Sequence, residues 1–401
     1  LDLVVLNPAN TPVTYETPQT LEGRLKGGTN RWPVELHGQA GSSAAIVAGG
    51  FSSRPYVFTL PAGVAGQLVT DEALEAVLAE MEAVNAGAPI TVFEILMAAT
   101  FVLFARVPAD LCILEVGLGG RFDATNVIAA PKACAITALS LDHREFLGNT
   151  LAEIAFEKAG IMKPHAPVVT GFQPPEAMAV LLAQAAAVGA PLLARGRDWH
   201  IEPAAAGLRY RDAEGVLDLP PPSLLGPHQV ENAGIAVAVM RAAGMMGDAA
   251  IARGVATAEW PARMQRLTGP LARMLPADWE LWLDGGHNRG GGVVLGAHLA
   301  SWADRPVHLL VGMKQAKDTV EFLRPLLGHA ATVWAVAEPG QHLALPIERI
   351  IAASGGVARP GPDVRGALAQ LPRDGRPARV LICGSLYLAG EVLKLEGWVG
   401  R

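Results

Sequence analysis

The chain has 401 residues, of which 51% are hydrophobic and 17% are charged, and its formal net charge is −6. This length is too great for one typical core, and this composition excludes a disordered chain, so we expect a globular protein with two domains. The negative balance and the lack of a basic stripe argue against nucleic-acid binding. Anionic substrates would therefore have to be bound by local Lys, Arg or metal ions.

The three cysteines, Cys112, Cys134 and Cys383, lie in apolar runs without metal-binding spacing. This pattern favours buried free thiols in a reducing compartment. The first ten residues lack a basic region and a long apolar stretch, and the most apolar helix candidate, residues 95–105, is too short to span a bilayer. We therefore predict a cytoplasmic protein without membrane contact.

Residues 1–70 carry weak patterns, from which we expect a helix at 21–25 and strands at 32–36 and 56–60. From Asp71 the patterns are clearer, beginning with a helix to about Asn85 whose first turn holds acidic residues.

Strands and helices then alternate. We expect strands at 111–114, from 135, and at 168–171, and helices at 150–159 and 176–188. We also expect a small β excursion at 191–222 and, at 226–240, a loop that leads into an Ala-rich helix. After a hinge at 258–270, in which Arg263, Gln265 and Arg266 crowd together, strands are predicted at 279–283, 307–311, 332–337 and 380–383, with helices between them. This order predicts a mostly parallel, doubly wound α/β sheet and a second, smaller α/β domain. We place the domains at 1–265 and 266–401.

The strand at 111–114 ends in a carboxylate and a glycine-rich turn. Glu115 is followed by Gly117, Gly119 and Gly120 in the run EVGLGGRFDATN. Glycines allow a sharp turn and a close approach to a ligand, and ligands of open α/β sheets bind at the carboxyl ends of strands. An ordinary strand-to-loop turn explains the glycine spacing equally well.

The next strand leads to Asp142 and His143, and then to the run LGNTLAEIAFEKAGI. Together the two runs closely resemble the central motifs of the dihydrofolate synthase/folylpolyglutamate synthase family, within the Mur-ligase superfamily. The resemblance implies a larger N-terminal P-loop-type ATPase domain and a smaller Rossmann-like C-terminal glutamate-ligase domain. It implies an ATP-dependent carboxylate–amine ligase that adds L-glutamate to dihydropteroate, to reduced folates or to both through an acyl phosphate. It also favours a monomer.

The resemblance assigns metal ligands to Glu115 and His143, and it implies a carbamylated Lys158 that helps to hold a second Mg²⁺. A carboxylate and an imidazole at strand ends suit a Mg²⁺ ion that also binds nucleotide phosphates. The alternative is that the first two residues are only solvated or hydrogen-bonded. Lys158 would then be an ordinary cation at the end of a helix.

Further motifs match the family in the same order along the chain. In GPHQVENAG, the residues that match are His228, Gln229 and Asn232, and the resemblance places Asn232 on the nucleotide. It places Arg263 on phosphate from the hinge, and Asp284 and His287, in LDGGHNRGG, at the nucleotide across the two domains. Departures from the family pattern are Gly286 in place of Ala and Arg289 in place of Pro. The pair Lys317-Asp318 and the run CGSLYLAGEV also match, although each of these residues could be an ordinary capping or surface residue.

The family's phosphate-binding loop, GTNGKGS in form, has no clear counterpart here. The strand expected at 33–36 leads into HGQAGSSAA, where Gly38 and Gly41 are candidates for phosphate contacts and Ser42 or Ser43 for a hydroxyl on phosphate and Mg²⁺. No Lys occurs between Lys26 and Lys132. Three explanations stay open: the recorded sequence is incomplete or mis-assigned in this region, the protein is a divergent ligase that uses other cations, or it is a catalytically impaired paralogue that binds nucleotide or folate without turnover.

Rival functions are weaker. A Mur-type cell-wall ligase shares the chemistry, but the run EVGLGGRFDATN speaks against it. A dehydrogenase would need a G-x-G-x-x-G sequence after its first strand, which is absent.

Overall fold

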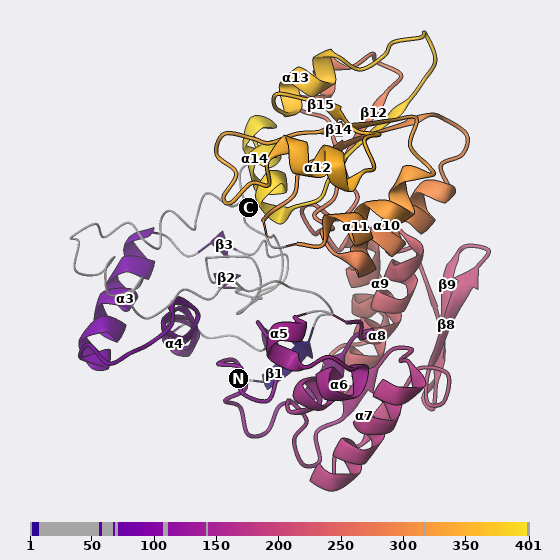
Figure 1. The fold of residues 1–401 in the computed structure, drawn as a ribbon. Coiled ribbons are helices and arrows are strands. Elements are labelled where there is room, and N and C mark those ends of the chain that lie inside the picture. The colour runs from indigo at the N-terminus through magenta and orange to yellow at the C-terminus, as the bar shows by residue number, and fades with distance from the viewer. Residues whose placement is uncertain are drawn as a thin grey trace.

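The computed structural model describes residues 2–7, 56–57, 67–68, 71–106, 111–141, 143–315 and 317–398. Within these residues the chain forms two α/β units, each built on its own sheet (Figure 1). The expectations for residues 21–25 and 32–36, and the candidates Gly38, Gly41 and Ser42, lie outside the described residues.

The first sheet has five parallel strands in the order β4-β1-β5-β6-β7. Their bounds are β1 (Asp2–Asn7), β4 (Leu111–Glu115), β5 (Ala133–Ile136), β6 (Val168–Thr170) and β7 (Leu192–Ala194). Sequence patterns do not predict β1, which lies between β4 and β5 with Leu6 opposite both Glu115 and Ala135. In β5 and β6 every residue is buried, as expected for parallel strands that are covered on both faces.

Helices cover both faces of this sheet. The helices of the first unit are α3 (Asp71–Asn85), α4 (Val92–Arg106), α5 (Arg144–Leu147), α6 (Leu151–Ala159), α7 (Pro175–Val188), α8 (Pro227–Ala243) and α9 (Asp248–Thr257). Cys134 and Ile136 of β5 pack with α6 and α7, whereas Ala133 and Ala135 pack with α8. The predicted capping box is confirmed, because Thr150 and Glu153 exchange their hydrogen bonds at the start of α6.

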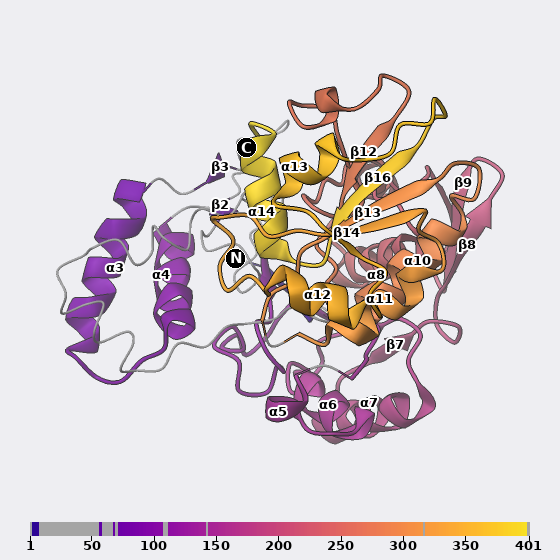
Figure 2. The same cartoon turned by 45° about the horizontal axis from the view of Figure 1, so that its top comes forward.

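Smaller elements complete the first unit. The predicted β excursion is confirmed as the antiparallel strands β8 (His200–Ala204), β9 (Gly207–Asp212) and β10 (Gly215–Leu219), although β7 belongs to the main sheet. Strands β2 (Tyr56–Val57) and β3 (Gln67–Leu68) pair with each other. Helices α3 and α4 lie side by side at one side of the molecule and share a small core of their own (Figures 1 and 2).

The second sheet has six strands in the order β11-β12-β16-β13-β14-β15, and only β11 is antiparallel to its neighbour. The strands are β11 (Gln265–Leu267), β12 (Glu280–Leu283), β13 (Val307–Val311), β14 (Thr332–Ala335), β15 (Arg359–Pro360) and β16 (Arg379–Cys383). Around them lie η1 (Ala272–Met274), α10 (Arg289–Ala300), α11 (Thr319–Leu327), α12 (Ile347–Ala353), α13 (Val364–Ala369) and α14 (Leu386–Leu395).

Helices also cover both faces of the second sheet (Figure 2). Leu309 and Leu381 pack with α10, α11 and α12, whereas Leu310 and Ile382 pack with α13 and α14. Strand β16 lies between β12 and β13, and the helix that follows β16 covers the opposite face from the helices that follow its two neighbours. The sheet therefore has its topological switch points beside β16.

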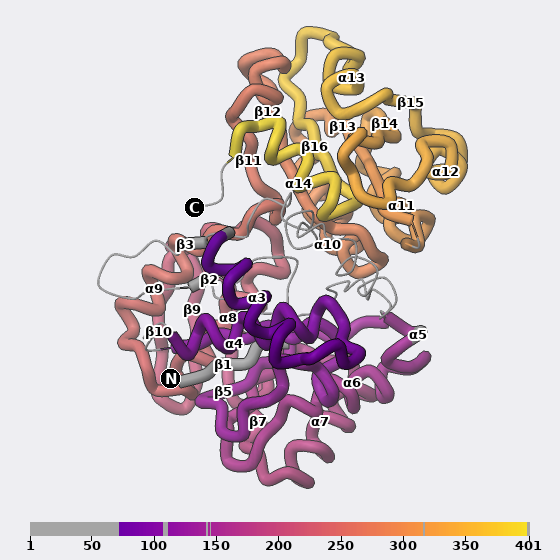
Figure 3. The backbone as a smooth tube through the Cα atoms, turned by 90° about the vertical axis from the view of Figure 1, so that its left-hand side faces the viewer, coloured from indigo at the N-terminus to yellow at the C-terminus, as the bar shows by residue number. Residues whose placement is uncertain are grey.

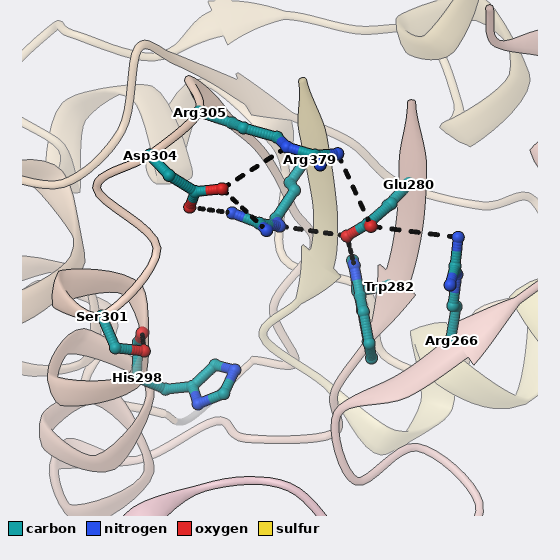
Figure 4. Close-up of polar contacts among 8 residues, drawn as sticks. All are labelled: Arg266, Glu280, Trp282, His298, Ser301, Asp304, Arg305 and Arg379. Carbon is teal, nitrogen blue, oxygen red and sulfur yellow. Dashed lines mark hydrogen bonds and ion pairs between the residues drawn. The ribbon is translucent and has the colours of Figure 1, made fainter. Parts of the chain in front are cut away.

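The amino end of the second sheet is held by an ion network (Figure 4). Arg379, at the start of β16, donates to Glu280 at 3.0 Å and to Asp304 at 2.6 and 3.2 Å. Arg305 lies 3.6 Å from Glu280 and 3.4 Å from Asp304, and Arg266 lies 3.9 Å from Glu280. Arg266 of the predicted hinge therefore lies on β11 and joins this network, whereas Arg263 lies before β11.

The segment between the two sheets is shorter than the predicted hinge, because β11 already begins at Gln265. Ala262 and Met264 have left-handed φ angles of 56° and 44°, which strain residues other than glycine. Helices α8 and α10, one from each unit, meet where the units face each other (Figures 1 and 3).

The three cysteines are buried and free, as predicted. Burial raises the pKa of Cys112 and of Cys134 to about 12. No helix of the described part of the chain combines the length and the apolar character that a membrane span requires.

Candidate functional site

A buried carboxylate ends strand β4. Glu115 is only 8% exposed, and its Oε2 atom has no hydrogen-bond partner among the described residues. Burial raises the pKa of Glu115 to about 7, and the positive charge of Arg263 acts in the opposite direction. A buried carboxylate oxygen without a donor is rare in folded proteins, and it fits a cation as its missing partner.

The glycines after Glu115 allow the loop to pack closely against neighbouring helices. A Cβ atom on Gly117 would collide with the ring of Phe93, and one on Gly120, at φ 155°, would lie about 3 Å from the carbonyl oxygens of Glu157 and Lys158. These glycines therefore let the loop approach α4 and the last turn of α6. The close approach expected toward a ligand is, at these two positions, an approach to the chain itself.

Polar residues of the same loop fix its shape. Asp123 accepts hydrogen bonds from the backbone of Leu118 and from the backbone and hydroxyl of Thr125. Asn126 donates to the carbonyl of Gly160 at 3.0 Å. The loop that begins at Glu115 is thus anchored on the end of α6, the helix that carries Lys158.

The predicted metal ligands have different surroundings. Lys158 is buried in the last turn of α6, and His143 is partly exposed, with a left-handed backbone (φ 50°, ψ 39°), at the start of α5. Within the described ranges, no cluster of three or more His, Cys, Asp or Glu side chains could hold a metal ion by itself. The orphaned oxygen of Glu115 is therefore the observation that fits a cation.

A relay of side chains orients a histidine at the start of α8. Asn232 donates to Oε1 of Gln229 at 3.0 Å, and Nε2 of Gln229 lies 3.0 Å from Nε2 of His228. The amide can only donate there, so the ring proton of His228 is on Nδ1, which has no acceptor among the described residues. Burial and the nearby charge of Arg263 lower the pKa of His228 to about 4, so the ring is neutral at pH 7.

Asp284 ties the hinge to the second sheet. Its two carboxylate oxygens accept from the backbone of Met264 at 2.9 Å and of Gly286 at 2.7 Å. The next residue, Gly285, donates to the carbonyl of Ala262 at 2.8 Å. Burial raises the pKa of Asp284, and Arg263 opposes this shift. Asp284 therefore holds two backbone segments together, and we call this arrangement the backbone clamp. The position of Asp284 in a motif does not reveal this role.

His287 lies beside this clamp. Its side chain is buried, and its Nδ1 atom donates to the carbonyl of Gly285 at 3.0 Å. The ring is thus fixed by the same short turn that carries Asp284.

The positive charge of Arg263 acts on three of these groups. Its guanidinium acts on the pKa values of Glu115, His228 and Asp284, which come from the first sheet, from α8 and from the second sheet. These three residues therefore lie within electrostatic range of one cation between the two units.

Other matched residues have local structural roles. Asp318 caps α11 by accepting from the backbone of Glu321, and Asn288 caps α10 by accepting from Gly291. Arg289 is exposed at the first position of α10, 3.6 Å from Glu321.

Sequence patterns do not single out Lys314 and Gln341 at the carboxyl end of the second sheet. Lys314 lies 3.5 Å from the hydroxyl of Tyr387, in the matched run CGSLYLAGEV, and Gln341 donates to the carbonyl of Met313. The available signal was the position of Lys314, three residues beyond the end of an apolar strand.

Comparisons with known proteins agree with the motifs. Residues 271–395 match the family model described as the dihydrofolate synthetase C-terminal domain. The folylpolyglutamate synthase of Lacticaseibacillus casei is 33% identical over 331 residues, which cover 80% of this chain and 74% of that protein. The dihydrofolate synthetase of Saccharomyces cerevisiae is 30% identical over 341 residues, or 79% of each chain.

A similar solved structure is a bifunctional folylpolyglutamate synthase/dihydrofolate synthase with Mn, AMPPNP and L-glutamate bound. It superposes with a TM-score of 0.73 at 25% identity and covers 98% of this chain and 89% of that chain. These findings confirm the Mur-ligase-like two-domain fold and favour an active ligase over the impaired paralogue. The chain belongs to the dihydrofolate synthase/folylpolyglutamate synthase family of ATP-dependent carboxylate–amine ligases.

Proposed function

We propose that this protein binds ATP and a divalent metal ion and joins L-glutamate to dihydropteroate, to a reduced folate or to both, through an acyl phosphate. The observation that carries the proposal is the gathering of the buried groups of Glu115, His228 and Asp284 around Arg263, between the two sheets. The solved relative with Mn, AMPPNP and L-glutamate supports the same classes of ligand for this chain.

The residues of the first unit would bind the nucleotide and its metal ions. Glu115 and His143 would hold Mg²⁺, a carbamylated Lys158 would help to hold a second Mg²⁺, and Ser42 would contribute a hydroxyl. Bound Mg²⁺ neutralises charge on the phosphate oxygens. Gly38, Gly41 and Asn232 would contact the nucleotide.

The residues between the units would act on the transferred phosphoryl group. Arg263 offers a fixed positive charge there, and such charge stabilises a phosphoryl-transfer transition state. His228 is neutral and presents the N–H of its Nδ1 atom, and Asp284 and His287 keep the turn beside Arg263 in place. Closure of the two units would exclude water, so that the acyl phosphate meets the amine of L-glutamate and not a water molecule.

The proposal also includes points that the sequence raised. The two domains divide close to residues 265 and 266, where β11 of the second sheet begins, the protein acts as a monomer, and it works in the cytoplasm.

The test is ADP release from ATP and Mg²⁺, with and without L-glutamate, against dihydropteroate and tetrahydrofolate in turn. Turnover that needs both L-glutamate and one acceptor would establish the ligase and name its activity. A sample that binds ATP but releases no ADP under any condition would instead support the impaired paralogue.

A matched pair of variants connects the activity to the site. Arg263→Met should lower kcat by about 100-fold or more, the usual effect of removing one charge that faces the reacting group. Arg266→Met, three residues away on the exposed side of β11, should leave kcat within about twofold, because Arg266 contacts only the exposed edge of the ion network.

A further inference from the structure

The ring of His228 is held at two of its edges by neighbouring residues. Gly226, just before α8, has φ 121°, and a Cβ atom built on it would lie 2.6 Å from Cε1 and 2.8 Å from Nδ1 of His228. The ring therefore occupies space that only a glycine leaves open. At the other edge, Nε2 of His228 lies 3.0 Å from Nε2 of Gln229. These two contacts fix the direction in which each ring nitrogen points.

The amide of Gln229 has a fixed orientation. Gln229 is 5% exposed, and its Oε1 atom accepts a hydrogen bond at 3.0 Å from Nδ2 of Asn232, one turn further along α8. Turning this amide over would place its NH₂ group against that of Asn232, and a buried amide that loses its partners is unfavourable. The end of Gln229 that faces His228 is therefore its N–H donor.

This orientation determines the protonation of the imidazole. An amide nitrogen can only donate, so Nε2 of His228 accepts and carries no proton. Burial lowers the pKa of His228 to about 4, and the charges of Arg263 in the hinge and His298 on α10 act in the same direction. The ring is thus neutral at neutral pH, with its proton on Nδ1. The other neutral form and the imidazolium would both bring a ring N–H against the N–H of Gln229.

The N–H at Nδ1 is suited to an anionic ligand. The Nδ1 atom is buried and meets no acceptor in the part of the chain that the structure describes. Arg263 lies within electrostatic range of the ring. A phosphate oxygen would accept the N–H and pair with the guanidinium, as phosphates do with such donors. A neutral donor achieves this without a second positive charge that would repel Arg263.

We propose that Gln229 is a positioning residue that keeps the proton of His228 on Nδ1, so that the ring donates a hydrogen bond to the transferred phosphoryl group. This inference rests on the proposed function. Asn232 takes part as well, because its N–H keeps Oε1 of Gln229 turned away from the ring. The relay from Asn232 through Gln229 thus connects the expected nucleotide contact with a donor at the reacting group.

The variant Gln229→Glu reverses one hydrogen bond of the relay and preserves the other. Its carboxylate still accepts from Asn232, but it can only accept from the ring, so it places the ring proton on Nε2. Nitrogen-15 NMR of histidine-labelled protein distinguishes a protonated ring nitrogen from a bare one, and the signals that disappear in His228→Asn identify His228. In alkaline buffer, where both rings are neutral, we expect the proton on Nδ1 in the wild type and on Nε2 in Gln229→Glu. A bare Nδ1 in the wild type would overturn the proposal.

The same variant has a kinetic signature. In alkaline buffer Gln229→Glu should lower kcat by about 10- to 100-fold, because Nδ1 no longer donates, while the KM for ATP stays within about threefold. The new carboxylate raises the pKa of the ring, so at lower pH Nδ1 regains a proton and part of kcat should return. The matched control is Gln370→Glu, because Gln370 is exposed and donates to the carbonyl of Gly366; it should show neither change.

A double-mutant cycle separates positioning of the proton from a structural role. In His228→Asn, the amide nitrogen takes the place of Nδ1 and donates without a choice of tautomer, so at least about a tenth of kcat should remain. His228→Leu, which has no donor, should lose more. In the His228→Asn background, Gln229→Glu should cost less than about threefold, because no ring proton is left to misplace. An equal cost in both backgrounds would mean that Gln229 acts only on the structure or through its charge.

Failure of this inference differs from failure of the proposed function. A wild-type protein that turns over, together with an additive cycle or a kcat of Gln229→Glu that matches the wild type, overturns the positioning role alone. A wild-type protein that releases no ADP with any acceptor contradicts the ligase and, with it, the hydrogen bond to the phosphoryl group.

Discussion

Buried charged groups are paired at the amino end of the second sheet, whereas buried polar groups at its carboxyl end lack partners among the described residues. At the amino end, Arg379 and Glu280 are mostly buried, with side chains 12% and 18% exposed, and each has a charged partner (Figure 4). At the carboxyl end, Lys314 is buried with no carboxylate within ion-pair distance among the described residues, and Oε1 of Gln341 accepts nothing.

This difference indicates that the amino end of the sheet contributes to stability and that its carboxyl end is suited to binding a ligand. Paired charges at the amino end fix the first residues of β12 and β16. Unpaired polar groups at the carboxyl end cost stability in the empty protein, and they persist where a ligand supplies the missing partner.

The largest effect on stability is expected at the amino end. Arg379→Met should lower the free energy of unfolding by about 3 kcal/mol, because it leaves Glu280 without its closest cation. Urea unfolding followed by tryptophan fluorescence would measure this, since Trp302 lies under Arg379 at 4.9 Å. Arg376→Met is the control, because Arg376 is exposed and, among the described residues, pairs only with Asp374; its effect should be much smaller than that of Arg379→Met. Equal losses in the two variants would remove the contrast.

The next effect is the pH dependence of stability that His228 of the first unit causes. The pKa of His228 in the folded protein, about 4, lies below the ordinary value of 6.5. Protons therefore bind more tightly to the unfolded chain between pH 4 and 6.5. Stability falls as pH drops through this window, by up to about 3 kcal/mol from this group alone.

His228→Gln removes this titration, so its stability should depend less steeply on pH between 6.5 and 4 than that of the wild type. Chemical unfolding at several pH values would measure the slopes. His329→Gln, at an exposed position, should keep the wild-type slope. Parallel curves for His228→Gln and wild type would contradict the assignment of a buried neutral ring.

A smaller effect of opposite sign is expected at the carboxyl end. Lys314→Met should raise the free energy of unfolding of the ligand-free protein by about 1 kcal/mol, because it removes a buried ammonium that has no counterion. The measurement is the midpoint of urea unfolding without ligands. A marked loss of stability would mean that Lys314 is a structural cation like Arg379, and that the two ends are alike.

The smallest effect tests a departure from the family pattern. Arg289 is the first residue of α10, where Pro is well tolerated, and its ion pair with Glu321 is exposed. Arg289→Pro should change stability by less than about 0.5 kcal/mol and leave activity intact. A large loss of glutamate-dependent turnover would show that this exposed position takes part in catalysis.

Local patterns were the predictable part of the fold. Helix α3 and the pair Thr150–Glu153 follow from residues within a few positions of one another, and the apolar runs of β13 and β16 mark buried strands. Helix α9 was not predicted, because its short run DAAIARGVAT is rich in Ala and has few apolar anchors.

The candidate site was predictable only in part. Motif order identified Glu115, Arg263 and Asp284, but not that both oxygens of Asp284 bind backbone N–H groups. Lys314 and Tyr387 are 73 positions apart and meet only because β16 inserts between β12 and β13. Such contacts depend on strand order, which single-sequence patterns do not specify.

The clamp made by Asp284 has a mechanical consequence. It binds the backbone of Met264, and Gly285 binds that of Ala262, so Arg263 is held to the second unit from both sides. Any rotation between the units must pivot before Ala262 and carry Arg263 with it. Any separation of the units would therefore move Arg263 away from Glu115 together with the second unit, and their approach would return its positive charge to that carboxylate.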